Sequence, residues 1–212
     1  MPALPLQKIF LSFPPTFLLF LSLYYMKEKL MEHSESSVEK LNFFQNGDET
    51  FWQSIIAEYS QWLYNLSLRI VRHSNDAEDI VQETFLQAFR ARKQLKDFNS
   101  LQGWLRQICL RLCLRKSRFS KTVSLQEVEA FLPDDKLEST TKSVASKEEL
   151  EMVLDGFSKL SQRQRACLTL SVFEDLSIEE ISQSLGISNG AVKRYIYEAR
   201  QTLQKFLKGG MR

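Results

Sequence analysis

The chain has 212 residues, of which 43% are hydrophobic, and its formal net charge at pH 7 is +2. This length accommodates one or two domains, and the low content of Gly (7) and Pro (5) suits an all-helical protein with a buried core. Neither of the two histidines stands at a catalytic or metal-ligand spacing, so we expect no enzyme and no cofactor.

The three cysteines are Cys109, Cys113 and Cys167, an odd number that gives no disulfide framework, so a reducing compartment and a cytoplasmic location are expected. Cys109 and Cys113 lie four residues apart on a predicted helix and could offer two thiolates to a metal. No CxxC pair or nearby histidine completes such a ligand set, so small buried core residues are the favoured interpretation.

Charge is unevenly distributed along the chain. Residues 88–121 contain ten Lys or Arg and one acidic residue, whereas residues 122–151 contain eight acidic residues and three Lys. A basic block followed by an acidic one indicates a polyanion-binding surface followed by a linker.

Residues 1–33 form an apolar leader that we expect to lie outside the fold. Residues 9–25 are almost all apolar, but Pro14 and Pro15 leave a run of about ten residues, short of the roughly twenty that a membrane helix needs. Three interpretations are open: a membrane anchor, a signal peptide without a small-residue cleavage site, and sequence upstream of a true start at Met26 or Met31. The last of these is favoured.

A long helix is predicted over residues 49–73, with Asp48 as its N-cap. Its inner side carries an apolar stripe rich in aromatic residues: Phe51, Trp52, Ile55, Ile56, Tyr59, Trp62, Leu63, Leu66 and Ile70. Such a stripe is more typical of a core than of a platform for stacking bases.

Two further helices are predicted over residues 76–95 and from residue 101 to about residue 119, with the loop LKDFNS at residues 95–100 between them. The first is capped by Asn75 or Asp76, and its acidic first turn offsets the helix dipole. The second carries Arg111, Arg115 and Arg118 in one basic stripe. Without acidic partners these arginines repel one another unless phosphates are bound.

Residues 121–146 contain Pro133, lack a helical stripe and are rich in Ser, Thr and acidic residues, so they are predicted to be an interdomain linker. An amphipathic helix follows over residues 150–160. Ser161 and Gln164 then form a capping box that begins another helix, reaching about residue 174.

Residues 176–207, LSIEEISQSLGISNGAVKRYIYEARQTLQKFL, carry two successive helix starts. Ser177 and Glu180 form a capping box, Gly186 ends the first helix, and Ser188 caps the second. The second helix has a buried stripe formed by Val192, Ile196, Ala199, Leu203 and Leu207. Its opposite side is polar and basic, which favours a DNA-binding helix-turn-helix over an ordinary helical hairpin.

The segments DAEDIVQETFLQAFRA and SLQGWLRQI resemble the second conserved region of bacterial RNA polymerase sigma factors. The segment LSQRQRACLTLSVFEDLSIEEISQSLGISNGAVKRYIYEARQTL resembles their fourth conserved region. The pairing of these two regions across a short linker is similar to the extracytoplasmic-function (ECF) group. The resemblance implies a region 2-like domain at residues 34–120, a linker at residues 121–146 and a region 4-like domain at residues 147–212.

The resemblance also implies three binding surfaces. Binding of core RNA polymerase is expected from Asp76, Glu78, Asp79, Gln82 and Glu83. Recognition and opening of the −10 element, with a flipped base and a basic path for the single strand, are expected from Lys96, Phe98, Asn99, Arg106, Arg111, Arg115 and Arg118. Recognition of the −35 element in the major groove is expected from Ser188, Asn189, Lys193, Arg194, Tyr197, Glu198 and Arg200.

Two features depart from the family pattern. Tyr195 and Glu198 stand where relatives commonly carry a basic residue, although Glu198 can accept a hydrogen bond from cytosine N4. The loop at residues 96–100, KDFNS, lacks the Gly often found there, which implies a differently shaped base pocket.

The leading hypothesis is therefore a non-enzymatic sigma factor whose partners are core RNA polymerase and promoter DNA, with an anti-sigma protein as a third candidate. A helix-turn-helix repressor or activator that works without polymerase is the alternative, but such a protein has no use for a strand-opening module at residues 76–120. A membrane-tethered signalling protein rests on the leader alone.

Overall fold

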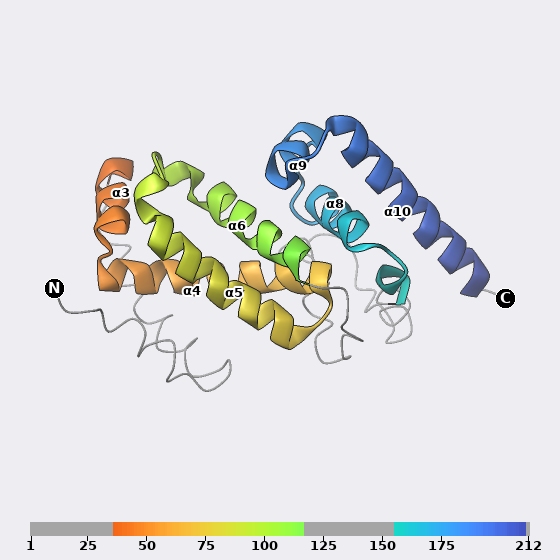
Figure 1. Ribbon diagram of the computed structural model, residues 1–212, viewed down its shortest axis with the longest axis horizontal. Helices are drawn as coiled ribbons and strands as arrows, with labels where there is room; N and C mark the ends of the chain where they lie inside the picture. Colours follow the sequence, from red (N-terminus) through yellow and green to blue (C-terminus); the bar gives the residue numbers. More distant parts are fainter. Residues whose placement is uncertain (1–35, 117–154, 211–212) are drawn as a thin grey trace, which may run out of the picture. The chain divides into compact units, whose positions relative to one another are not determined.

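The computed structural model describes residues 36–116 and 155–210, and every regular element in these ranges is helical (Figure 1). The all-α prediction is confirmed. The elements are α3 (Ser37–Asn46), α4 (Glu49–Val71), α5 (Ser74–Ala91), the 3-10 turns η1 (Arg92–Gln94) and η2 (Phe98–Ser100), α6 (Leu101–Arg115), α8 (Gln162–Val172), α9 (Ile178–Leu185) and α10 (Asn189–Gly210).

The chain divides into two compact units, and the division runs through α4, α5 and α6. One unit comprises residues 1–61 and 85–104, and the other comprises residues 62–84 and 105–212. The predicted leader and linker, together with His33 and Arg118, lie outside the described residues. Within the described ranges, no helix combines the length and the apolar character needed to cross a membrane.

The first unit begins with α3, a helix that the sequence analysis did not single out. Its start is a capping box, in which Ser36 Oγ accepts from the Glu39 amide and Glu39 Oε2 accepts from the Ser36 amide. Its end is Gly47, whose φ of 76° is a left-handed conformation that glycine adopts without strain. The next helix follows directly, because Asp48 Oδ1 accepts from the Phe51 amide at 2.9 Å, which confirms Asp48 as the cap of α4.

An aromatic cluster forms the core of the first unit. The Phe44 and Trp52 rings stack with centroids 4.4 Å apart, and the indole of Trp52 donates to the Phe44 carbonyl at 3.0 Å. Phe89 packs edge-on against Trp52, and Trp104 packs edge-on against Phe44. This cluster confirms the core interpretation of the aromatic stripe on α4, although Phe51, Ile56, Tyr59 and Trp62 are only half-buried.

In the second unit the C-terminal half of α4 packs with α5 and α6 through fully buried aliphatic side chains, including Leu66, Ile70 and Ile108. Cys109 and Cys113 lie in this core, and Cys109 Sγ is 3.1 Å from Ser67 Oγ. Cys167 is buried as well. All three thiols are therefore core residues, as predicted, and burial raises the pKa of Cys167 to about 11.

The C-terminal helices α8, α9 and α10 carry the predicted helix-turn-helix. Both predicted capping boxes are present, at Ser161 with Gln164 and at Ser177 with Glu180. Gly186 ends α9 with a φ of 62°, and Ser188 Oγ accepts from the Ala191 amide at the start of α10. Val192, Ile196 and Ala199 are buried as expected, whereas Leu207 is 38% exposed, so its assignment to the buried stripe is wrong.

Several predicted helix boundaries are also corrected. The helix predicted over residues 76–95 begins at Ser74 and ends at Ala91, because the chain tightens there into the 3-10 turn η1. Half of the predicted loop is the 3-10 turn η2, in which Asp97 Oδ1 accepts from the Asn99 amide at 3.0 Å and leads the chain directly into α6. The helix α8 ends at Val172, two residues before the predicted end.

Candidate polymerase and promoter interfaces

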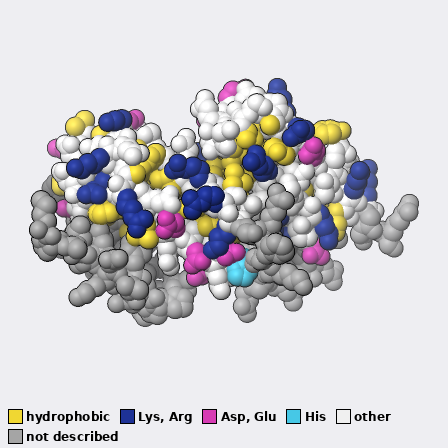
Figure 2. Space-filling view, in the orientation of Figure 1, with side chains coloured by type: hydrophobic (Ala, Val, Ile, Leu, Met, Phe, Trp, Pro, Cys, Tyr) yellow, Lys and Arg dark blue, Asp and Glu magenta, His cyan; other side chains and the backbone are white. Residues whose placement is uncertain are grey.

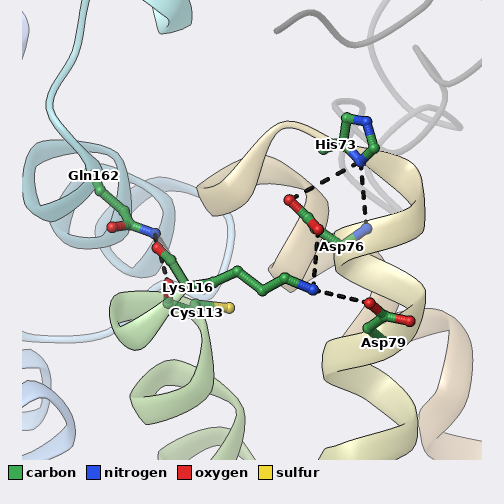
Figure 3. Close-up of polar contacts among 6 residues, drawn as sticks. All are labelled: His73, Asp76, Asp79, Cys113, Lys116 and Gln162. Carbon is green, nitrogen blue, oxygen red and sulfur yellow. Dashed lines mark hydrogen bonds and ion pairs between the residues drawn. The ribbon is translucent and has the colours of Figure 1, made fainter. Parts of the chain in front are cut away.

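The acidic start of α5 is held by a lysine from the end of α6 (Figure 3). Lys116 Nζ lies 2.9 Å from Asp76 Oδ1 and 2.9 Å from Asp79 Oδ2. On the other side of Asp76, His73 Nδ1 accepts from the Asp76 amide at 3.4 Å. Burial lowers the pKa of Lys116, but the hydrogen bonds to Asp79 and Asp76 outweigh it, so this pKa lies above its usual value.

The five residues expected to bind polymerase thus differ in exposure. Asp79 and Gln82 are exposed, while Asp76, Glu78 and Glu83 are half-buried. The dipole of α5 also stabilises Asp76, which lies in the first turn of the helix. The acidic residues therefore form a surface in which two members already have an internal cation.

The loop expected to read the −10 element is built on the aromatic cluster. Lys96 and Asn99 are exposed, and Asn99 Oδ1 accepts from Ser37 Oγ of α3 at 3.3 Å. Phe98 is half-buried, with its ring centroid 5.6 Å from that of Phe51 and 6.3 Å from that of Phe44. One part of the Phe98 ring is therefore core, and the remainder is exposed to solvent.

The arginines of α6 separate into two groups. Arg111 and Arg115 are exposed one turn apart, as a phosphate-binding pair requires. Arg106 is largely buried: its Nε lies 3.4 Å from Glu174 Oε2, without the alignment of a hydrogen bond, and its guanidinium stands over the Trp62 ring. The indole of Trp62 donates to the same carboxylate, at 3.0 Å from Oε2. Basic side chains stand out over α6 in the space-filling view (Figure 2).

The outer side of α10 presents most of the residues expected to read the −35 element. Those that are exposed are Ser188, Asn189, Lys193, Arg194, Tyr197 and Arg200, with Tyr197 at 65%. Glu198 is half-buried and has partners on both sides. Its Oε2 accepts from Gln164 Nε2 of α8 at 3.1 Å, and its Oε1 lies 3.7 Å from Arg194 Nε.

Three contacting residues were missed as parts of these surfaces: Lys116, Glu174 and Gln164. Each acts through a contact with a residue distant in sequence, and spacing along one helix carries no signal for such a contact. Gln164 was identified as a cap, and this was the available signal for its orientation. Among the described residues, no three His, Cys, Asp or Glu side chains are grouped so that they could hold a metal ion.

Comparisons with known families agree with this geometry. Residues 55–122 match the family described as Sigma-70 region 2, and residues 150–203 match Sigma-70, region 4. The first match contains α5, the 95–100 loop and α6, and the second contains the helix-turn-helix.

The chain is also similar over most of its length to known sigma factors. The chain is 28% identical over 185 residues to ECF RNA polymerase sigma factor SigE of Mycolicibacterium smegmatis, covering 84% of this chain and 70% of the relative. It is also 28% identical over 185 residues to RNA polymerase sigma-H factor of Pseudomonas aeruginosa, covering 83% and 94%. ECF RNA polymerase sigma factor SigW of Bacillus subtilis is 26% identical over 186 residues, with coverages of 80% and 96%.

Solved structures share the fold. CnrH, in complex with the cytosolic domain of CnrY, aligns with a TM-score of 0.59 and 22% identity over 82% of this chain and 99% of that chain. RpoE in complex with the anti-sigma factor NepR, from Bartonella quintana, aligns with a TM-score of 0.55 and 20% identity over 74% and 96%.

The fold and the two matched regions define a sigma factor, a non-catalytic protein that directs RNA polymerase to promoters for transcription initiation. More specifically, the chain belongs to the ECF-type RNA polymerase sigma factors, with sigma-70 regions 2 and 4.

Proposed function

We propose that this sigma factor reads the −35 element with the outer side of α10 and opens the −10 element with the 95–100 loop and α6. The observation that supports this proposal most directly is that α10 has one buried side and one exposed side. Val192, Ile196 and Ala199 are buried, whereas Lys193, Arg194 and Tyr197 are exposed. A helix held by one side presents the other side to the major groove.

The −10 assignment is supported by the half-exposed ring of Phe98 and by the exposed pair Arg111 and Arg115. An opened strand needs an aromatic face on which an unstacked base rests and cations that follow its phosphates. Lys96 and Asn99 flank Phe98 on the same loop, and both are exposed. Arg106 is also assigned to the −10 element, with the condition that a phosphate replaces Glu174 as its partner.

Binding of core polymerase is assigned to the acidic side of α5, on which Asp79 and Gln82 are exposed. We further propose that residues 34–120 and 147–212 are the two functional domains, joined by residues 121–146, and that the protein acts in the cytoplasm beside polymerase. CnrH and RpoE were each solved with a partner protein, named as an anti-sigma factor for RpoE. An anti-sigma protein is proposed for this chain by that analogy.

Transcription with core RNA polymerase tests the assignment. The full chain is combined with core enzyme and a promoter library randomised at the −35 and −10 elements, and the transcripts are sequenced. Arg194→Ala should change preference at one −35 position by about 5- to 160-fold, because a base contact is worth about 1–3 kcal/mol. Arg111→Ala should lower all transcripts alike. An unchanged −35 preference for Arg194→Ala would refute the assignment of α10.

A further inference from the structure

A chain of polar contacts connects the start of α8 to the exposed side of α10. The Ser161 amide donates to Gln164 Oε1 at 2.8 Å, and Gln164 Nε2 donates to Glu198 Oε2 at 3.1 Å. Glu198 Oε1 in turn lies 3.7 Å from Arg194 Nε, one turn earlier on α10. The contacts therefore run from a helix cap to a side chain assigned to base reading.

We propose that Gln164 is a positioning residue for −35 recognition: it holds Glu198, which holds the guanidinium of Arg194 at the DNA-facing side of α10. This inference rests on the proposed −35 role of α10. Gln164 and Glu198 would then shape sequence preference without contacting a base edge themselves. Glu198 is thereby reassigned from a candidate base reader to a support for the reader.

The capping box fixes the orientation of the Gln164 amide. Its Oε1 is required as an acceptor at the N-terminus of α8, so its NH2 group is left to point towards Glu198. The backbone of Gln164 is held as well, because its amide donates to Ser161 Oγ at 3.3 Å. Because both the backbone and the side-chain amide of Gln164 are held, its NH2 group can restrict the Glu198 carboxylate to one rotamer.

The contact with Glu198 also determines which part of Arg194 is available. The carboxylate lies nearest to Nε, which leaves the end of the guanidinium formed by the two terminal nitrogens to bind a guanine O6 and N7 as a pair. The guanidinium also stands 5.2 Å from the centroid of the Tyr195 ring, which restricts it further. Arg194 has an exposed side chain (62%), so without such supports it would be free to change rotamer.

A base-reading role for Glu198 makes a different demand. To accept from cytosine N4, the carboxylate would have to face the groove, whereas here one oxygen faces α8 and the other faces Arg194. The two roles therefore predict different effects of the same substitutions. If Glu198 supports Arg194, variants of Gln164, Glu198 and Arg194 should all alter the preference at the same base position. If Glu198 reads a base directly, its variants should alter the preference at a different position from Arg194 variants.

The test uses the full chain with core polymerase and the randomised −35 library. Gln164→Glu is the main variant, because a glutamate at this position keeps the capping box but cannot donate to Glu198. It should weaken preference by about two- to fivefold at the position altered by Arg194→Ala, as expected for a partly exposed contact. Combining Gln164→Glu with Arg194→Ala should add nothing beyond Arg194→Ala alone. Gln204→Glu, the same change at an exposed site on α10, should have no effect.

Unfolding midpoints of the variants exclude a fold defect, and Gln164→Ala provides a second variant without the added charge. A wild-type preference in both Gln164 variants, with a change in Arg194→Ala, would overturn the inference and leave the role of α10 intact. An unchanged Arg194→Ala profile would overturn both. If Glu198→Gln alters a different base position from Arg194→Ala, Glu198 reads a base directly and the support role is wrong.

Discussion

Replacement of Phe98 by leucine should separate the structural role of this ring from its role in strand opening. The ring lies 5.6 Å from Phe51 and 6.3 Å from Phe44, and it is half-buried. Each aromatic pair contributes about 0.5–1.5 kcal/mol beyond its buried area, and leucine keeps most of that area. Loss of both pairs in Phe98→Leu should therefore lower the free energy of unfolding by about 1–3 kcal/mol. For a domain of this size, each kcal/mol lowers the unfolding midpoint by about 4–8 °C.

Strand opening should be reduced independently of this loss of stability. Stacking of a base on an aromatic side chain is worth about 1–3 kcal/mol, so loss of the ring should reduce open complexes by about 5- to 160-fold. Closed complexes should form normally, because duplex binding does not require a flipped base. Permanganate footprinting of unpaired thymines reports the opening, and gel mobility of the polymerase–promoter complex reports the binding.

Phe51→Leu is the matched control, because it removes the same ring pair from the α4 side. It should cost similar stability and leave opening close to that of the wild type. Normal footprints in Phe98→Leu would refute the stacking role, and an equal loss of opening in Phe51→Leu would assign the effect to packing of the loop.

Three further predictions concern the charged surfaces. Charge reversal at Asp79 and Glu83 should weaken core polymerase binding by at least about tenfold in a pull-down titration, with some loss of stability because the Asp79–Lys116 ion pair is broken, and equal affinity would remove α5 from the interface. Lys116→Met should cost at most about 1 kcal/mol of stability, because both ion pairs are partly solvated. Because the pKa of Lys116 is raised, this stability difference should be constant through neutral pH and, on the alkaline side, should be lost as pH rises above about 10.4; a difference lost near pH 7 would contradict the ion-pair origin. Arg111→Ala should reduce the salt slope of promoter binding by about one, and an unchanged slope would exclude a phosphate contact.

The elements that the sequence predicted well are those encoded by neighbouring residues. A capping box involves residues three apart, as at Ser177 and Glu180, and a left-handed Gly such as Gly186 acts on its own turn. The buried stripe of α10 repeats with the helical period, so its position followed from the sequence as far as the helix packs on α8. It failed at Leu207, where the helix runs on with an exposed side.

The contacts that the sequence did not predict connect residues far apart along the chain. The ring of Phe98 on the loop meets Phe44 on α3, a helix that the periodicity analysis passed over because its core contribution is a single buried residue. Lys116 lies in the basic block at residues 88–121, yet it pairs with the acidic start of α5. Composition identifies which side chains carry charge, but only the packing of helices determines which charges meet.

The contact of Arg106 with a residue distant in sequence changes the expectation for its binding to DNA. Phosphates were expected for Arg111, Arg115 and Arg118 because no acidic residue stands near them on the same helix, whereas Arg106 was expected to bind DNA from the family resemblance alone. Arg106 has nonetheless acquired an acidic partner, Glu174, with a side chain that is 6% exposed. A buried carboxylate that loses its cation leaves an uncompensated charge, so a phosphate would bind Arg106 only at the cost of Glu174. The argument from unpaired charge therefore applies to Arg111 and Arg115, and those two are where a phosphate path along α6 should be tested first.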